Sequence, residues 1–111
     1  MIAKACVKFA RITARKMRVV ADLIRGRTVG DAITILDNTP KHGSLVLKKL
    51  LKSAQTSALL KDPNAKPDDL RISTLYVDGG PVLKRWLPRA HGRATPILKR
   101  SCHAVLQLEK V

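Results

Sequence analysis

Hydrophobic and polar residues alternate in three stretches of the chain, and this period of two is typical of strands with one buried face. The predicted strands cover residues 3–9, 70–77 and 101–109. In the middle stretch the apolar positions change phase between Ile72 and Leu75, which predicts a β-bulge or burial on both faces. The inward positions predicted for the first and last strands are Ala3, Ala5, Val7, Phe9, Cys102, Ala104, Leu106 and Leu108.

Three further stretches repeat apolar residues every three or four positions, as amphipathic helices do. The predicted helices cover residues 14–25, 30–37 and 40–60. Thr13 is a suitable N-cap for the first helix, and Gly26 a suitable C-terminal residue. For the third helix we expect Thr39 as the N-cap and Pro40 at the first helical position.

This order of elements predicts an α+β fold, in which three helices pack on a three-stranded antiparallel sheet. The chain of 111 residues is long enough for one compact domain and hardly for two. We therefore expect a single domain over residues 1–111. Its body covers about residues 1–79 and 101–111, and a long basic β-hairpin over about residues 80–100 protrudes from it.

The hairpin segment, DGGPVLKRWLPRAHGRATPILKR (78–100), lacks the alternation that would place one face on a core. Pro and Gly within residues 88–92 predict the chain reversal, and Gly79-Gly80-Pro81 predicts a kink where the hairpin leaves the body. Each arm would have roughly ten residues and span about 30 Å. An isolated two-stranded hairpin is marginally stable in water, so we expect an external polyanion to hold it.

Charge supports this expectation, because 22 Lys and Arg against 8 Asp and Glu give a net charge of +14. No apolar run approaches the ~20 residues that span a membrane, so nucleic acid is favoured over a membrane surface. With only three aromatic residues, contact with phosphates is favoured over base stacking. The candidate RNA-binding residues are Arg11, Arg15, Lys16, Arg18, Arg25 and Arg27 in and around the first helix, and Lys84, Arg85, Arg89, Arg93, Lys99 and Arg100 in the hairpin.

Within the first helix, Asp22 is positioned four residues after Arg18 and is predicted to pair with it. On the third helix, Lys41, Lys48, Lys49 and Lys52 have no acidic neighbour. These lysines form either a rim of the anion-binding surface or a solvated helix face, and the pattern does not decide between the two.

Catalytic and metal chemistry find little support. Adjacent Asp68 and Asp69 lie in a proline-rich loop and are more simply a polar turn than a catalytic pair. The histidines and the two cysteines match no metal-ligand spacing. We expect no enzyme activity, no cofactor and no metal. We expect Cys6 and Cys102 to act as small hydrophobic residues in a reducing compartment, and a disulfide between them across the sheet is the less favoured alternative. Residues 1–10 do not resemble a signal peptide.

Four segments resemble the family of bacterial-type large-subunit ribosomal protein number twenty-two. They are RKMRVVADLIRG (15–26), VDGGP (77–81), LKRWLPRAHGRATPILKR (83–100) and SCHAVLQLE (101–109). The resemblance covers nearly the whole chain in order. It implies a structural constituent of the large ribosomal subunit that binds large-subunit ribosomal RNA, helps assembly and reaches the nascent-peptide exit tunnel with its hairpin. The implied tunnel tip comprises Trp86, Pro88, Arg89, Ala90, His91, Gly92 and Arg93.

The resemblance also implies partners and a location. The partners are large-subunit ribosomal RNA, neighbouring proteins including large-subunit protein number four, and the nascent peptide, with the chain monomeric within the ribosome and no membrane involved. We expect a cytoplasmic ribosome, and an organellar one stays open. Leu59 and Leu60 depart from the usual family pattern and are predicted to meet a neighbouring protein; Pro96 lacks the N–H of a ladder bond, which leaves open whether the arms pair there. The alternative function is that of a DNA-bending architectural protein with basic β-arms.

Overall fold

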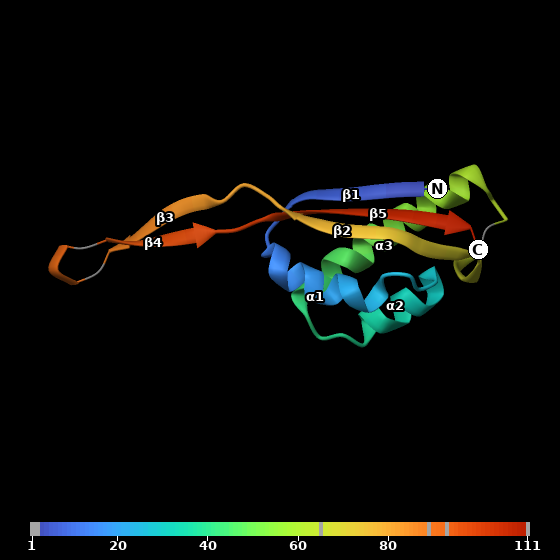
Figure 1. The fold of residues 1–111 in the computed structure, drawn as a ribbon, viewed down its shortest axis with the longest axis horizontal. Helices are drawn as coiled ribbons and strands as arrows, with labels where there is room; N and C mark the ends of the chain where they lie inside the picture. The colour runs from blue at the N-terminus through green and yellow to red at the C-terminus, as the bar shows by residue number, and fades with distance from the viewer. Residues whose placement is uncertain (1–2, 65, 89, 93, 111) are drawn as a thin grey trace.

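The computed structural model describes residues 3–64, 66–88, 90–92 and 94–110. The molecule is elongated, with principal extents of 65 × 25 × 16 Å and a radius of gyration of 17.1 Å. A compact chain of this length would have a radius of gyration of about 13 Å. The difference arises from the hairpin, which projects from one end of the body along its long axis (Figure 1).

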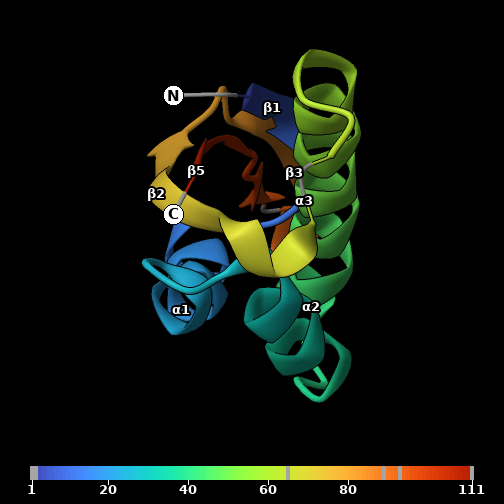
Figure 2. The same ribbon diagram turned by 90° about the vertical axis from the view of Figure 1, so that its right-hand side faces the viewer.

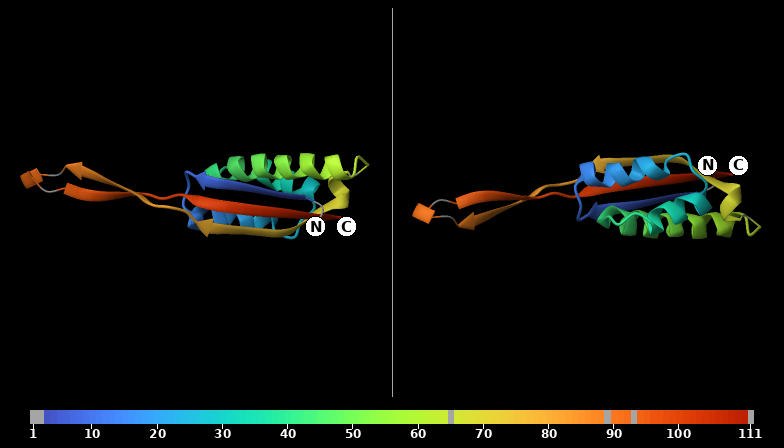
Figure 3. Two further views of the ribbon diagram at one scale, coloured as in Figure 1. Left: turned by 90° about the horizontal axis from the view of Figure 1, so that it is seen from above. Right: turned by 90° about the horizontal axis from the view of Figure 1, so that it is seen from below.

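The body contains the predicted three-stranded antiparallel sheet. Its strands are β1 (Ala3–Ala10), β2 (Leu70–Gly79) and β5 (Cys102–Lys110), in the order β1-β5-β2. Figure 3 shows β5 between the two other strands. The pairing of β2 with β5 shifts register between Ile72 and Thr74, which confirms the predicted bulge.

Helices α1 (Ala14–Ile24), α2 (Val29–Asp37) and α3 (His42–Lys61) cover the inner face of this sheet. In the end-on view α1 and α3 lie against the curved sheet and α2 lies beneath it beside them (Figure 2). The apolar stripes meet in one core cluster. Its largest fully buried side chains are Met17, Ile24, Leu47, Leu51, Leu70, Ile72, Leu106 and Leu108.

The predicted caps are correct for α1 and wrong for α3. Thr13 accepts a hydrogen bond from the backbone N–H of Lys16 (3.3 Å) and so caps α1. The third helix begins at His42 rather than Pro40, and its N-cap residue makes no side-chain capping bond. The Thr39 hydroxyl instead donates to the carbonyl oxygen of Ile35 (2.7 Å), so it serves the end of the preceding helix.

The inward position predicted for Phe9 is also wrong. The register of β1 against β5 shifts between Val7 and Ala10, and Phe9 has a positive φ of 58°. A bulge adds one residue and reverses the alternation, so Ala10 takes the core position while Phe9 is 59% exposed. The ring of Phe9 packs edge-on against the His103 ring, with centroids 4.9 Å apart. The backbone N–H of Phe9 donates a hydrogen bond to His103 Nδ1 (3.0 Å).

The protruding hairpin is a separate two-stranded sheet of β3 (Leu83–Pro88) and β4 (Ala94–Lys99). The chain reverses between these strands through a short helical turn, Ala90–Gly92, as predicted. Pairing is continuous and includes Trp86 opposite Pro96, so the proline does not interrupt the arms. A two-stranded ribbon tolerates proline because each strand has an outer edge that needs no donor.

Two hydrogen bonds join the arms at the neck, where the hairpin meets the body. The Gly80 N–H donates to the carbonyl of Ser101 (2.9 Å), and the Ser101 hydroxyl donates to the carbonyl of Pro81 (2.7 Å). A Cβ atom at Gly80 would lie 2.6 Å from the Ser101 hydroxyl oxygen. A Cβ at Gly80 would therefore displace the Ser101 hydroxyl, whereas a Cβ at Gly79 would meet open space.

Both cysteines are free, with Cys6 exposed and Cys102 buried. They face different partners in the sheet, because Cys6 lies opposite Val105 and Cys102 lies opposite Ala10. Burial raises the pKa of the Cys102 thiol. Cys102 is thus a small hydrophobic residue, as the sequence predicts.

Candidate nucleic-acid interface

The hairpin presents its cations on a surface that touches no core. Every described side chain from Leu83 to Arg100 is exposed except that of Ile97, which is half-buried. Trp86 is 65% exposed, at the middle of β3. No acidic residue occurs between Asp78 and Glu109 in the sequence. Of the predicted site residues, Lys84, Arg85, Lys99 and Arg100 lie on this surface, and Arg89 and Arg93 fall outside the described residues.

Two arginines, Arg18 in α1 and Arg25 at its C-cap, serve a structural purpose that the sequence did not indicate. Arg18 donates from Nε (3.1 Å) and Nη2 (2.9 Å) to the carbonyl of Val77, and Arg25 donates from Nε to the carbonyl of Leu75 (2.9 Å). Both carbonyls belong to β2, an edge strand of the sheet. These side chains therefore fasten α1 to the sheet edge and have only part of their donor capacity left for a ligand.

The predicted pairing of Asp22 with Arg18 is wrong, since Asp22 forms its ion pair with Arg25. Arg18 is instead turned toward β2, where a carbonyl oxygen accepts two of its N–H groups. Arg27 lies past the end of α1, and its backbone carbonyl accepts the N–H of Ile72. It is thus at the end of the body that is farther from the hairpin.

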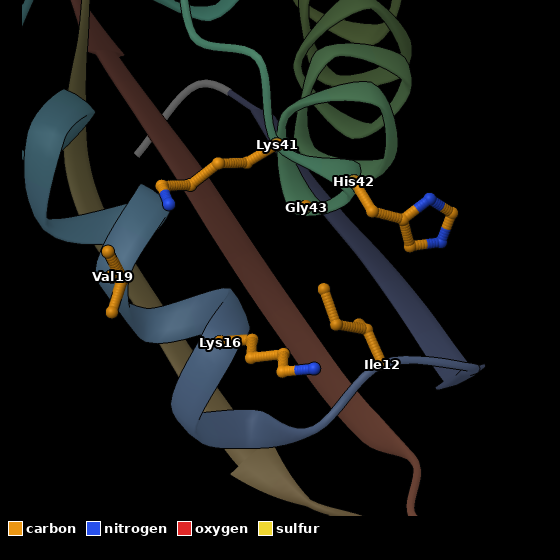
Figure 4. Close-up of a pocket in the computed structure, with 6 residues that line it drawn as sticks. All are labelled: Ile12, Lys16, Val19, Lys41, His42 and Gly43. Carbon is orange, nitrogen blue, oxygen red and sulfur yellow. The ribbon is translucent and has the colours of Figure 1, made fainter.

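Lys16 of α1 lies with cations from other segments around two adjoining cavities at the base of the hairpin, which we call the root groove. One cavity, of about 330 Å³, lies between the starts of α1 and α3 (Figure 4). The other, of about 290 Å³, extends to the end of β4. Together they are lined by Arg11, Ile12, Thr13, Lys16, Val19, Lys41, His42, Gly43, Lys99 and Arg100.

The root groove unites four predicted site residues from two segments of the chain: Arg11, Lys16, Lys99 and Arg100. It adds Lys41 and His42 from the start of α3. From the sequence it was open whether Lys41 belongs to the anion-binding surface, and nothing indicated His42. Arg15 is exposed on α1 and does not line either cavity.

Acidic side chains collect at the opposite end of the body. Asp62 pairs with Lys110 at 3.0 Å, and Glu109 pairs with Arg71 at 3.3 Å, where β5 ends and β2 begins. The hydrogen bond from Lys110 lowers the pKa of the Asp62 carboxyl. Asp69 accepts from the N–H of Lys66 (3.4 Å), which fits the predicted polar turn rather than a catalytic pair. The hairpin and these three acidic residues thus lie at opposite ends of the long axis, since β5 ends and β2 begins at the end of the body away from the hairpin (Figure 1).

Other kinds of site find no support in the part of the chain that the structure describes. Within it, no group of three or more His, Cys, Asp or Glu side chains converges as a metal site would require. None of its helices is long and apolar enough to cross a membrane. His103 Nδ1 already accepts the N–H of Phe9. Exposed cations are therefore the chief chemical feature of this surface.

Comparison with known proteins gives a consistent family. The family model described as ribosomal protein L22p/L17e matches residues 5–109. A curated relative from Desulfotalea psychrophila, named large ribosomal subunit protein uL22, is 44% identical over 110 residues, covering 99% of each chain. A relative of the same name from Syntrophobacter fumaroxidans is 46% identical over 111 residues, covering 97% of each chain.

Proposed function

The chain belongs to the ribosomal protein L22p/L17e family, which makes it a structural, non-enzymatic constituent of the large ribosomal subunit, and we propose how it binds there. In this proposal the hairpin and the first helix bind large-subunit ribosomal RNA and help the subunit assemble. The hairpin tip lines the nascent-peptide exit tunnel. The family assignment decides against the DNA-bending alternative.

The observation that carries the binding proposal is the solvent-exposed hairpin, which contains no acidic residue. Its described side chains bury almost no apolar surface, and a two-stranded ribbon of this kind is marginally stable alone. Exposed Lys84, Arg85 and Lys99 repel one another unless anions lie between them. RNA phosphates supply those anions, and the planar guanidinium of arginine grips a phosphate with two hydrogen bonds.

The finer partners follow from the resemblance and are part of the proposal. The tip would lie beside large-subunit protein number four and touch the nascent peptide, with the chain monomeric within the ribosome. Leu59 and Leu60 are exposed at the end of α3 and would meet another neighbouring protein. The site of action is the ribosome, which we place in the cytoplasm.

The RNA-binding proposal is tested by the salt dependence of affinity for a large-subunit RNA fragment. Each phosphate contact contributes about 0.7 to 0.9 to the slope of log K against log salt. In the double variant Lys84→Ala, Arg85→Ala, the fall of log K with log salt should be less steep by about one to two. The matched control Lys61→Ala, Lys66→Ala removes the same charge from exposed positions at the end of α3 and in the loop that follows, and it should leave the slope unchanged. If the hairpin variant kept the wild-type slope, these residues would not belong to the RNA-binding surface.

The tunnel proposal needs a separate test in assembled ribosomes. A photoreactive residue in place of His91, at the chain reversal, should cross-link to a stalled nascent chain. The same residue in place of Leu60, on the opposite part of the molecule, should not. A cross-link only at the Leu60 position would place the tip outside the tunnel.

A further inference from the structure

We propose that the uncovered face of the three-stranded sheet is a docking surface for a segment of a neighbouring large-subunit protein. The segment has apolar side chains along its centre and carboxylates opposite Lys4 and Lys8. This surface belongs to the body and lies apart from the hairpin and the first helix, so the inference goes beyond the RNA binding proposed above.

One face of the sheet has no layer of the protein upon it. Every second residue of β5 from Cys102 to Leu108 is fully buried under the helices, so the residues between them point to the opposite face. Those alternate residues are only half-buried, although β5 is the central strand. The left-hand view of Figure 3 looks onto this face, and no helix lies in front of the strands.

The centre of the uncovered face is apolar and aromatic, whereas a sheet face that meets only water is polar. The register places Cys6, Val105 and Tyr76 side by side across the three strands. Beside this row Phe9 packs on His103. Cys6 is exposed, as are Phe9 and Tyr76, which are two of the three aromatic residues of the chain. Aromatic side chains are enriched at protein–protein interfaces, so this row is a suitable centre for one.

The charges of this face favour a protein over RNA. Asp78 is exposed on β2, and the carboxylate of Glu109 is paired with Arg71 at 3.3 Å. A phosphate backbone on this face would be repelled by Asp78, a group that the hairpin lacks. Exposed Lys4 and Lys8, on the β1 side, take part in none of the four ion pairs between described residues. Carboxylates of a partner protein can pair with these two lysines.

The size of the face fits one segment of chain and not a whole domain. Three strands about 4.8 Å apart make a face roughly 14 Å wide, and eight residues, the length of β1, extend over about 26 Å. The resulting area of roughly 350 Å² is less than half of the about 800 Å² that each partner buries in a standard interface. The occupant is therefore a segment of a protein that other contacts already hold in the subunit.

Cross-linking in assembled large subunits identifies what covers the face. A photoreactive phenylalanine analogue in place of Tyr76, in the central row, should cross-link to a protein. The same analogue in place of Leu83, an exposed residue of the hairpin, is the matched control and should cross-link to RNA. An RNA adduct at the Tyr76 position, or no adduct there, would overturn the inference. Absence of the RNA adduct at the Leu83 position would count against the proposed hairpin function instead.

A second measurement uses the wild-type chain. Cys6 is an exposed thiol in the same central row, and Cys102 is buried. A thiol reagent should modify Cys6 at least about tenfold more slowly in the assembled subunit than in the free protein, because the interface must open before the reagent can enter. Equal rates in the two states would overturn the docking surface.

Charge reversal tests the acidic character of the partner. Lys4→Glu with Lys8→Glu should remove most of the protection of Cys6, measured as the ratio of its rates in the free variant and in the subunit. The ratio is needed because added carboxylates near a thiol also slow its own reaction. The matched control Lys49→Glu with Lys52→Glu reverses the same charge on α3, which covers the other face, and should keep the wild-type ratio. If the Lys4 and Lys8 variant kept that ratio as well, the inferred occupant would be wrong.

Discussion

Removing the hairpin should leave a folded body, because the two parts share almost no buried surface. The variant replaces residues 82–97 with a short Asn-Gly turn, which keeps Lys99 and Arg100. None of the described residues removed belongs to the core cluster, so the loss of hydrophobic stabilisation, at about 25 cal/mol per Å² of buried apolar surface, is close to zero. The neck bonds hold the chain ends beside each other, so a tight turn can join them.

The expected change in the free energy of unfolding follows from two small terms. Halving the length of a flexible connection between two elements raises the free energy of unfolding by about 0.6 kcal/mol, because less entropy is lost on closing the loop. Removing four cations from a chain of net charge +14 also reduces charge repulsion in the folded state. We therefore expect stability within about 1 kcal/mol of the full chain, on the stable side, and a melting temperature within about 8 °C of it.

Urea unfolding followed by far-UV circular dichroism measures this change, since Trp86 leaves with the hairpin and tryptophan fluorescence is lost. Leu47→Ala in the full chain is the positive control, because Leu47 is fully buried and its truncation should cost about 2 to 5 kcal/mol. A hairpin-free chain without a cooperative transition, or one destabilised by more than about 2 kcal/mol, would refute the division into body and hairpin.

Three shorter predictions concern single positions. Trp86 is 65% exposed, so the free protein should emit as a solvated indole and be quenched by acrylamide, and RNA binding should reduce the quenching; blue-shifted emission from the free protein would contradict an extended hairpin. In the native protein a thiol reagent should modify Cys6 rapidly and Cys102 only after unfolding, because burial raises the pKa of Cys102 and the thiolate is the reactive form; equal rates would contradict this. Gly80→Ala should cost about 1 to 3 kcal/mol in urea unfolding, because its Cβ would clash with the Ser101 hydroxyl. Adding Ser101→Ala should recover part of that loss, and strictly additive effects would argue against the clash.

The sequence predicted those parts of the fold that depend on local periodicity. The stripe of α1 recurs at helical spacing, and Met17, Val20 and Ile24 are all fully buried. The bulge in β2 was visible because the apolar residues change phase between Ile72 and Leu75. Such signals survive folding because each element buries its own apolar face.

The errors arise where distant groups compete with a local pattern. The alternation of β1 continues through Phe9 in the sequence, and only pairing with β5 and contact with His103 reveal the bulge. The Thr39 hydroxyl could either cap the start of α3 or bond to the end of α2, and it donates to the carbonyl oxygen of Ile35 in α2. Arg18 binds a carbonyl of Val77, a group that every residue type carries, so no residue pattern could have indicated it.

The candidate site shows the same division. The cations of the hairpin are evident in the sequence, because they form one acid-free segment. The root groove is not, because Lys16, Lys41 and Lys99 come together only when α1, α3 and β4 meet in space. A site assembled from three segments requires the fold before it can be recognised.

The separation of charge along the molecule bears on how the protein first meets RNA. The hairpin at one pole carries cations and no acidic residue, whereas near the other pole Asp62 and Glu109 are paired with Lys110 and Arg71. The excess positive charge therefore lies toward the hairpin and gives the chain an electric dipole in addition to its net charge. In the field of a polyanion such a dipole experiences a torque that turns the hairpin forward before any contact forms. Diffusional encounters are then biased toward hairpin-first insertion, and this steering should weaken as salt shortens the range of the field.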